Sequence, residues 1–298
     1  AQAPPGQPLP VTYEWIGRWQ ALRTGLVLLT WEPELSQTAD APSAAPPWIH
    51  DHAIGLGTLR PHPIQPHQTT LSAADINPEG CFRVVERLAT LPPASAIAGP
   101  YQLTGTYLDA EGAPQSLSSA ATVTLAAQAP TLPAPDLDWV TQLREVSGLL
   151  PQGPDFLDEV FDPIGRINLY DPIQDYTVQA ERSLQRRWQD QPELVNYGYG
   201  LVLAQVLQLK VDAAIASLEQ LVQRDAENPY AHAYLGFVNL YGLHPKAAQT
   251  ALAPALELAP ESPEIQGLSA VASLLRGNLW RAWQTGRAAI ALANQPER

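Results

Sequence analysis

The second half of the sequence repeats a small residue at a fixed interval, and this interval limits the folds open to it. Alanine recurs every 34 residues, at positions 180, 214, 248 and 282. Large apolar residues keep the same register four and eight residues later: Leu184, Leu218 and Leu252, then Trp188, Val222, Leu256 and Ile290. Helices that cross closely need a small residue at the crossing and large residues beside it. The period therefore predicts a series of stacked helix pairs, an α-solenoid.

The unit that begins at Pro229 shows the repeat most fully. It reads Pro-Tyr-Ala-His-Ala-Tyr-Leu-Gly over residues 229–236 and Ala-Leu-Glu-Leu-Ala-Pro over residues 255–260. Together with Ala248, these residues resemble the signature of the tetratricopeptide repeat family. The resemblance extends over residues 176–296, about three and a half repeats. It implies helix pairs whose first helices line a concave face.

The resemblance also implies which side chains form a groove on that face. By the family's positions, the groove residues are Tyr199, Leu203, Tyr230, Phe237, Leu240, Tyr241 and Leu274. They include none of the cations that chaperone-binding members use to clamp a carboxylate. The implied partner is another protein that presents a hydrophobic or amphipathic segment. Alternatively, residues 136–175 of the same chain fill the groove, because a large exposed apolar patch is costly.

Proline divides the chain into two parts. Residues 1–135 hold 19 of the 30 prolines, whereas the remainder holds 20 of the 30 acidic residues. The proline-rich residues 126–135 predict an extended hinge, and residues 1–10 an extended spacer. Residues 136–175 predict a helical connector that caps the solenoid of residues 176–298. In that connector, Asp-Pro pairs at 162–163 and 171–172 predict helix starts, since Asp caps well and Pro suits the first turn.

Residues 11–125 predict an antiparallel β-sandwich. Short apolar or alternating segments are separated by glycine and proline, without a helical period. The loop 109–112 has glycine at its end, which predicts a hairpin between residues 101–108 and 116–125. Residues 99–107 resemble the penultimate strand of bacterial immunoglobulin-like domains. The expected fold is thus an immunoglobulin-like sandwich followed by a tetratricopeptide solenoid.

Histidines form the one cluster that suggests chemistry. His50, His52, His62 and His67 lie within 18 residues of one another. The spacing of the first two puts both rings on one face of a strand, where they could bind zinc or copper together with His62 or His67. A solvated histidine-rich edge without a metal is the simpler interpretation, because no glutamate close in sequence supplies a base.

Other catalytic signals are missing from the sequence. It contains no phosphate-binding glycine loop and no Gly-x-Ser-x-Gly motif. The acidic residues 155–162 fit a helix start, where the dipole favours negative charge. The single cysteine, Cys81, is expected to be buried and inert. Neither an enzyme nor a cofactor is expected. A rival function is carbohydrate binding, in which exposed tryptophans of the sandwich, namely Trp15, Trp19, Trp31 or Trp48, stack on sugar rings.

Charge and composition limit the classes of partner and the cellular location that the sequence favours. The net charge of −13 and the presence of only two lysines, Lys210 and Lys246, disfavour nucleic acid and anionic membranes. No apolar stretch reaches the ~18 residues of a membrane span. Scarce lysine and the proline-rich start favour an exported protein, in a periplasm or a cyanobacterial thylakoid lumen, or the ectodomain of a membrane protein; cytoplasm is the alternative. The sequence thus predicts a non-enzymatic scaffold or assembly factor at a membrane surface.

Overall fold

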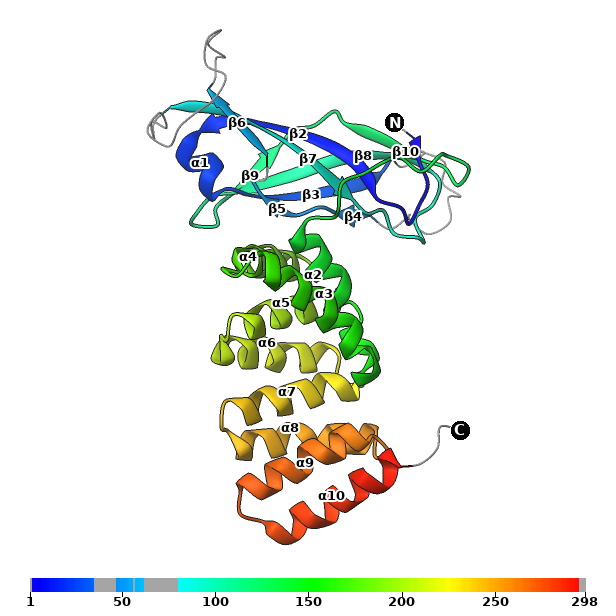
Figure 1. Ribbon diagram of the computed structural model, residues 1–298, viewed down its shortest axis with the longest axis vertical. Helices are drawn as coiled ribbons and strands as arrows, with labels where there is room; N and C mark the ends of the chain where they lie inside the picture. The colour runs from blue at the N-terminus through cyan, green and yellow to red at the C-terminus, as the bar shows by residue number, and fades with distance from the viewer. Residues whose placement is uncertain (1, 35–46, 56, 62–79, 295–298) are drawn as a thin grey trace. The chain divides into compact units, whose positions relative to one another are not determined.

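The structure, a computed structural model, describes residues 2–34, 47–55, 57–61 and 80–294 (Figure 1). The chain forms two compact units, Ala1–Gln142 and Leu143–Arg298. The first is built mainly of β-sheets and the second of paired helices, which confirms the predicted order of β and α parts. Within the described residues, no helix combines the length and the apolar composition needed to cross a membrane.

The first unit contains two sheets and one short helix, α1 (Trp19–Thr24). Its strands are β1 (Gln2–Ala3), β2 (Leu9–Arg18), β3 (Leu26–Pro33), β4 (Trp48–Ile49), β5 (His52–Ala53), β6 (Thr58–Pro61), β7 (Cys81–Thr90), β8 (Gly99–Leu108), β9 (Pro114–Leu117) and β10 (Thr122–Leu125). The larger sheet has the order β1-β10-β8-β3-β4, with β5 paired to β3 and β9 to β8; the smaller sheet is β2-β7-β6. Apart from the parallel β1–β10 pair, the described pairs are antiparallel.

Alternating apolar residues give the two sheets a shared core. Along β7, Phe82, Val84 and Leu88 are buried, and they belong to the same apolar cluster as Leu29 and Leu103 of the larger sheet. One face of each sheet is therefore apolar, which is the arrangement of a sandwich. The predicted hairpin is confirmed at its turn, because β8 pairs with β9 around a loop in which Gly112 has a φ of 85°. The predicted strand over residues 116–125 is instead two short strands, β9 and β10, which both pair with β8.

One contact of β8 is typical of immunoglobulin-like sandwiches. The buried Tyr101 near the start of this strand donates a hydrogen bond from its hydroxyl to the Ile97 carbonyl oxygen, at 3.0 Å. A tyrosine corner of this kind links a strand to the chain just before it. The immunoglobulin-like topology itself stays a prediction.

The ends of the first unit differ from expectation. Within the predicted spacer, Ala3 is buried and pairs with Leu125, and Leu9 already begins β2. Within the predicted hinge, Leu132 packs against the sandwich core. Proline removes a hydrogen-bond donor but does not prevent side-chain packing, so its abundance misled the prediction. Cys81 is exposed rather than buried, because it points away from the face that carries Phe82.

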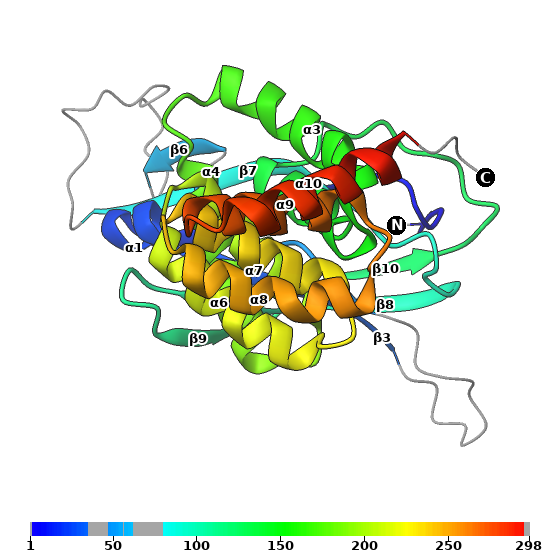
Figure 2. The same cartoon turned by 90° about the horizontal axis from the view of Figure 1, so that it is seen from below.

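The second unit consists of helix pairs. The chain's remaining helices are α2 (Trp139–Ser147), η2 (Leu150–Gln152), η3 (Pro154–Phe156), α3 (Leu157–Tyr170), α4 (Asp175–Asp190), α5 (Val195–Leu207), α6 (Val211–Arg224), α7 (Pro229–Tyr241), α8 (Pro245–Leu258), α9 (Pro263–Leu275) and α10 (Leu279–Ala293). The first helices α5, α7 and α9 begin 34 residues apart, and so do the second helices α6, α8 and α10. Consecutive helices pack against each other, and α9 and α10 run antiparallel in Figure 1; Figure 2 views the stacked helices from below. The predicted period is confirmed.

Small residues sit where these helices cross. Ala248 is fully buried in a cluster with Leu240, Leu252 and Ala272. A Cβ atom added to Gly236 would lie 2.5 Å from Cγ of Leu252, well inside van der Waals contact. The helices α7 and α8 therefore approach each other at a distance that only small residues permit.

The two Asp-Pro pairs do not start helices, contrary to prediction. Pro163 lies inside α3, and Pro172 lies in the turn before α4. Helical turns begin earlier, at Pro154, so α3 is already formed when it reaches Pro163. The carbonyl of Glu159 loses its helical donor there, but Glu159 is exposed to water.

The turn inside each repeat has a left-handed residue at the same place. Leu209, Leu243 and Gly277 have φ values of 57°, 58° and 75° and are spaced 34 residues apart. Only glycine adopts this conformation without steric cost. The first two repeats therefore keep a strained leucine where the third has glycine.

Replacing Leu243 by glycine should stabilise the helical unit. The left-handed conformation costs an ordinary residue about 1–2 kcal/mol. Glycine loses about 0.5–1 kcal/mol more conformational entropy, so we expect a net gain of up to about 1 kcal/mol. Leu243 is 77% exposed, so little apolar burial is lost. Urea unfolding measures the effect. The control Leu258→Gly, within α8, should lower the free energy of unfolding. If both variants change the free energy of unfolding in the same direction, Leu243 is not strained.

Substitutions at two neighbouring alanines test the helix crossing. Ala248→Trp should lower the free energy of unfolding by at least about 1–3 kcal/mol, because the crossing has no room for an indole. Ala247 is exposed, so Ala247→Gln should leave the melting temperature nearly unchanged. Thermal unfolding followed by circular dichroism compares them, and equal shifts would show that the register is wrong.

Candidate functional site

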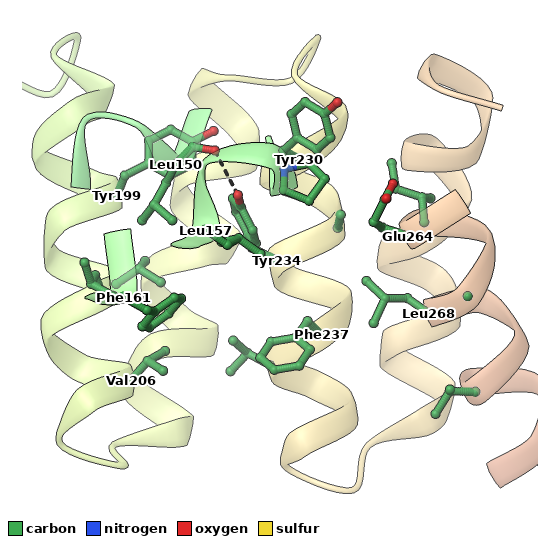
Figure 3. Close-up of a pocket in the computed structure, with 18 residues that line it drawn as sticks. Leu150, Leu157, Phe161, Tyr199, Val206, Tyr230, Tyr234, Phe237, Glu264 and Leu268 are labelled. Atoms are coloured by element: carbon green, nitrogen blue, oxygen red, sulfur yellow. Dashed lines mark hydrogen bonds between the residues drawn. The ribbon is translucent and has the colours of Figure 1, made fainter. Parts of the chain in front are cut away.

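The concave face of the helical unit encloses an apolar cavity of about 500 Å³ (Figure 3). The first helices α5, α7 and α9 form its floor, and the segment η2–η3–α3 forms a wall. Its lining residues are almost all aliphatic or aromatic: Leu150, Pro154, Leu157, Phe161, Tyr199, Val202, Leu203, Val206, Tyr230, Ala233, Tyr234, Phe237, Val238, Glu264, Ile265, Gly267, Leu268 and Val271.

Hydrogen bonds attach the wall to α7. The Tyr234 hydroxyl donates to the Leu150 carbonyl oxygen at 2.9 Å, drawn as a dashed line in Figure 3, and Asn228 Nδ2 donates to the Pro151 carbonyl oxygen at 3.1 Å. Gly153, with a φ of 116°, lies against the Tyr230 ring, and an added Cβ would come within 2.6 Å of its Cζ. A side chain at position 153 would therefore force the Tyr230 ring or the wall to shift, and the φ of 116° would strain any residue but glycine.

The sequence left open whether the groove is free for a partner or filled by residues 136–175, and the wall shows that each holds for part of the groove. Residues of the predicted connector cover one end of the concave face, where Tyr199 is 1% exposed. The other end stays open, and Phe237 is 48% exposed. The connector thus fills part of the groove and turns the rest into a cavity.

Four of the seven predicted groove residues line the cavity: Tyr199, Leu203, Tyr230 and Phe237. Leu240 is instead buried between α7 and its neighbours, beside Ala248. Tyr241 and Leu274 are exposed and are not among the lining residues.

The wall residues Leu157 and Phe161 were not predicted as part of the site. The two residues are four positions apart, a spacing that indicates one apolar face of an amphipathic helix. The sequence does not show against which surface that face packs.

Two tyrosines of the cavity, Tyr199 and Tyr234, act as neutral hydrogen-bond donors. Burial raises the pKa of Tyr199 far above its ordinary value, and Asp225, which accepts from its hydroxyl at 2.6 Å, raises it further. Burial likewise raises the pKa of Tyr234. Burial also raises the pKa of Tyr230, with the nearby charges of Asp155 and Glu264 adding to the effect. These phenols stay protonated at physiological pH, and the lining offers an apolar contact surface rather than acid–base chemistry.

The first unit contains a different feature, a carboxylate inside the sandwich core. Glu86 on β7 is fully buried. Its carboxylate accepts from Trp15 Nε1 at 2.6 Å and from the Gly55 backbone N–H at 2.8 Å, and it lies 3.3 Å from His52 Nε2. Burial alone would raise the pKa of Glu86, but His52, Gly55 and Trp15 together hold it below its ordinary value.

His50 belongs to the same buried group. Its Nδ1 lies 2.9 Å from the Tyr13 hydroxyl and its Nε2 lies 3.1 Å from Asp138 Oδ2. The ring of His52 is 4.8 Å away, so the two histidines share a face as the sequence predicted. Burial opposes ionisation of Asp138, but His50, His52 and Thr141 together lower the pKa of that carboxyl.

These contacts weigh against the metal hypothesis. Both nitrogens of His50 and both of His52 are engaged by oxygen atoms of the protein. Across residues 2–34, 47–55, 57–61 and 80–294, no three His, Cys, Asp or Glu side chains are grouped to hold an ion. His62 and His67 lie outside the described residues. The expectation of a solvated histidine edge is wrong as well, because His50 and His52 are both buried.

Of the four sandwich tryptophans, two lie in the core and two are partly buried against it. Trp31 and Trp48 are each 4% exposed and stack at 5.8 Å, while Trp15 and Trp19 pack against the same cluster. Sugar-binding tryptophans need an open ring face, so the feature that the carbohydrate alternative required is not found in these four residues.

Removing the charge of Glu86 should destabilise the first unit at neutral pH. The pKa of this group is lowered in the folded state, so its contribution is present above the ordinary value of 4.5 and is lost as the pH falls below it. Glu86→Gln should cost roughly 3 kcal/mol at pH 7, with a smaller difference from wild type near pH 3. Denaturant unfolding at both pH values tests this. The control Glu14→Gln removes an exposed ion pair with Arg83 and should cost less than about 1 kcal/mol.

Among known proteins, similar structures are found for the helical half of the chain. No protein-family model matches the chain, and no curated protein matches it. Solved structures of MamA, a tetratricopeptide-repeat protein, match about half of the chain. One is 18% identical with a TM-score of 0.38, covering 51% of this chain and 86% of MamA. Another, from AMB-1, is 18% identical with a TM-score of 0.38, covering 54% and 96%. A third, from MSR-1, is 17% identical with a TM-score of 0.37, covering 52% and 96%.

Likeness at this level does not indicate a shared function. The repeat architecture rests on the chain's own helix pairs, with their 34-residue period and their small residues at the crossings. The helical half is a series of helix pairs that resemble tetratricopeptide repeats, and the β-sheet half is assigned to no known family.

Proposed function

We propose that this protein is a non-enzymatic interaction scaffold whose helical unit binds a hydrophobic or amphipathic segment of another protein. The observation that carries the proposal is the open apolar mouth of the cavity. Phe161, Phe237 and Val271 are 43%, 48% and 45% exposed, although all three line an apolar hollow. Large apolar side chains left half-exposed around a concavity mark a binding surface.

The physical chemistry of the cavity favours such a ligand. Water in an apolar cavity lacks the two to four polar partners that hold an ordered molecule. An inserted apolar side chain gains about 25 cal/mol for each Å² removed from water. A cavity of about 500 Å³ has room for several such side chains. The preformed wall also reduces the ordering cost of binding.

The proposed setting is outside the cytoplasm, in association with a membrane complex. Support comes only from composition, namely two lysines in 298 residues and a high proline content. Cell fractionation with an antibody against the folded protein tests this part separately from the binding function.

Site-specific photocrosslinking tests the binding proposal. Phe237→p-benzoylphenylalanine puts the reactive group at the mouth of the cavity. It should crosslink to a defined partner in cells, because an anchor residue at the centre of an interface is shielded from water. Leu258, 45% exposed on α8, provides the control position, because it does not line the cavity. The same crosslinked products from both positions, or none from Phe237, would contradict the proposal.

A further inference from the structure

Four carboxylates lie on the elements that line the cavity, three on the wall and one on α9. Asp158 and Asp162 on α3 each follow a residue that lines the cavity, Leu157 and Phe161 respectively. One residue along a helix turns the side chain by about 100°. The two acidic side chains therefore lie on the exposed face of α3 directly beside the apolar stripe. Glu264 of α9 lies across the cavity from α3 and is itself a lining residue (Figure 3).

A fourth carboxylate, Asp155 of η3, lies at the same rim. Both Asp155 and Glu264 are close enough to the Tyr230 hydroxyl to oppose its ionisation, in addition to the effect of burial. Because Tyr230 lines the cavity, these two charges flank its apolar surface from the η3 side and from the α9 side.

Nothing in the floor of the cavity compensates for this charge. The three first helices α5, α7 and α9 contain no lysine and no arginine. Among the described residues, none of the four rim carboxylates forms an ion pair. Glu264 accepts one hydrogen bond, from the Ser262 hydroxyl at 2.7 Å. The one cation of the wall, Arg166, is exposed and lies one turn along α3 from Asp162. Asp155, Asp158 and Glu264 have no such neighbouring cation on the wall or the floor, so these elements carry a net negative charge around an apolar floor.

We propose that the occupant of the cavity is a cationic amphipathic segment of another protein. Its apolar side chains enter the cavity and its lysine or arginine side chains face the carboxylates of Asp155, Asp158, Asp162 and Glu264. This inference rests on the proposed function and specifies the charge of the partner. An acidic segment of equal hydrophobicity would bring like charges together over a surface of low dielectric constant, which disfavours its binding.

Two synthetic amphipathic peptides test the charge of the partner. They share one leucine face and one length, and carry either lysine or glutamate at every polar position. Fluorescence anisotropy with the full chain should show the lysine peptide binding at least about tenfold more tightly at ~0.05 M salt. The preference should shrink near ~0.5 M salt, where charges are screened. Equal affinities for the two peptides would overturn the inference.

Two sets of substitutions separate the rim from the overall charge. Asp158→Asn, Asp162→Asn and Glu264→Gln together should weaken the lysine peptide by about tenfold. Glu219→Gln, Glu227→Gln and Glu257→Gln remove the same charge from exposed positions outside the cavity lining and should change its affinity less than about twofold. Equal losses in both sets would show diffuse attraction to an acidic protein and would overturn the inference.

Phe237→Ser distinguishes this inference from the proposed function. If it abolishes binding of both peptides and the peptides bind equally, the cavity is a binding site without charge selectivity. If it leaves the lysine peptide unaffected, both proposals fail. Sedimentation velocity tests whether the occupant is instead a second copy of this chain. If the wild type self-associates and Phe237→Ser abolishes the self-association, a second copy is the occupant and the cationic-partner inference is overturned.

Discussion

The close crossing of paired helices is the constraint on which the helical unit depends. Where Gly236 meets Leu252, the two helices of a repeat approach within a distance that excludes even one added methyl group. The Gly236 contact is particular to this repeat, but the small residue of the second helix recurs at Ala214, Ala248 and Ala282, so each pair stacks on the last in the same orientation. The first helices consequently fall on one side and present a continuous face. The position of Phe237 on that face thus follows from small residues that lie elsewhere on the same helices.

The wall converts this face into a cavity. A bare row of first helices is an open groove, and its apolar residues would all face water. The segment that begins at Leu150 covers one end of the groove, and hydrogen bonds that its backbone carbonyl oxygens accept hold it there. Because every residue has a backbone carbonyl, these bonds do not depend on the side chains of the segment. Gly153 is the exception, since its side-chain hydrogen leaves room for the Tyr230 ring. Affinity for an apolar ligand and attachment of the wall therefore involve the same tyrosine-rich surface of α7.

The features that could be predicted are those encoded in local spacing. The 34-residue period specified the helix pairs, because helical geometry repeats regardless of what surrounds it. The family resemblance, not the period, put Phe237 among the groove residues, and Phe237 lines the cavity. Covering of the groove by residues 136–175 was one of two alternatives, but the residues that form the wall escaped prediction because its contacts join residues far apart in the chain, such as Leu150 and Tyr234, 84 positions apart. The histidine cluster shows the same limit. The spacing of His50 and His52 predicted that the two rings share a face. The burial of His52, however, depends on Glu86, which lies 34 residues away on another strand.

The cavity also affects how the solenoid holds together. In a linear array each repeat interacts only with its neighbours, so different parts of the array can unfold one at a time. The cavity lining, in contrast, runs from Leu150 to Val271 and includes residues of the wall and of three successive repeats. An occupant that contacts all of them would connect α3 with α9, and its binding energy would be lost if any one of these elements opened. Binding would thereby make a modular array behave as one cooperative folding unit.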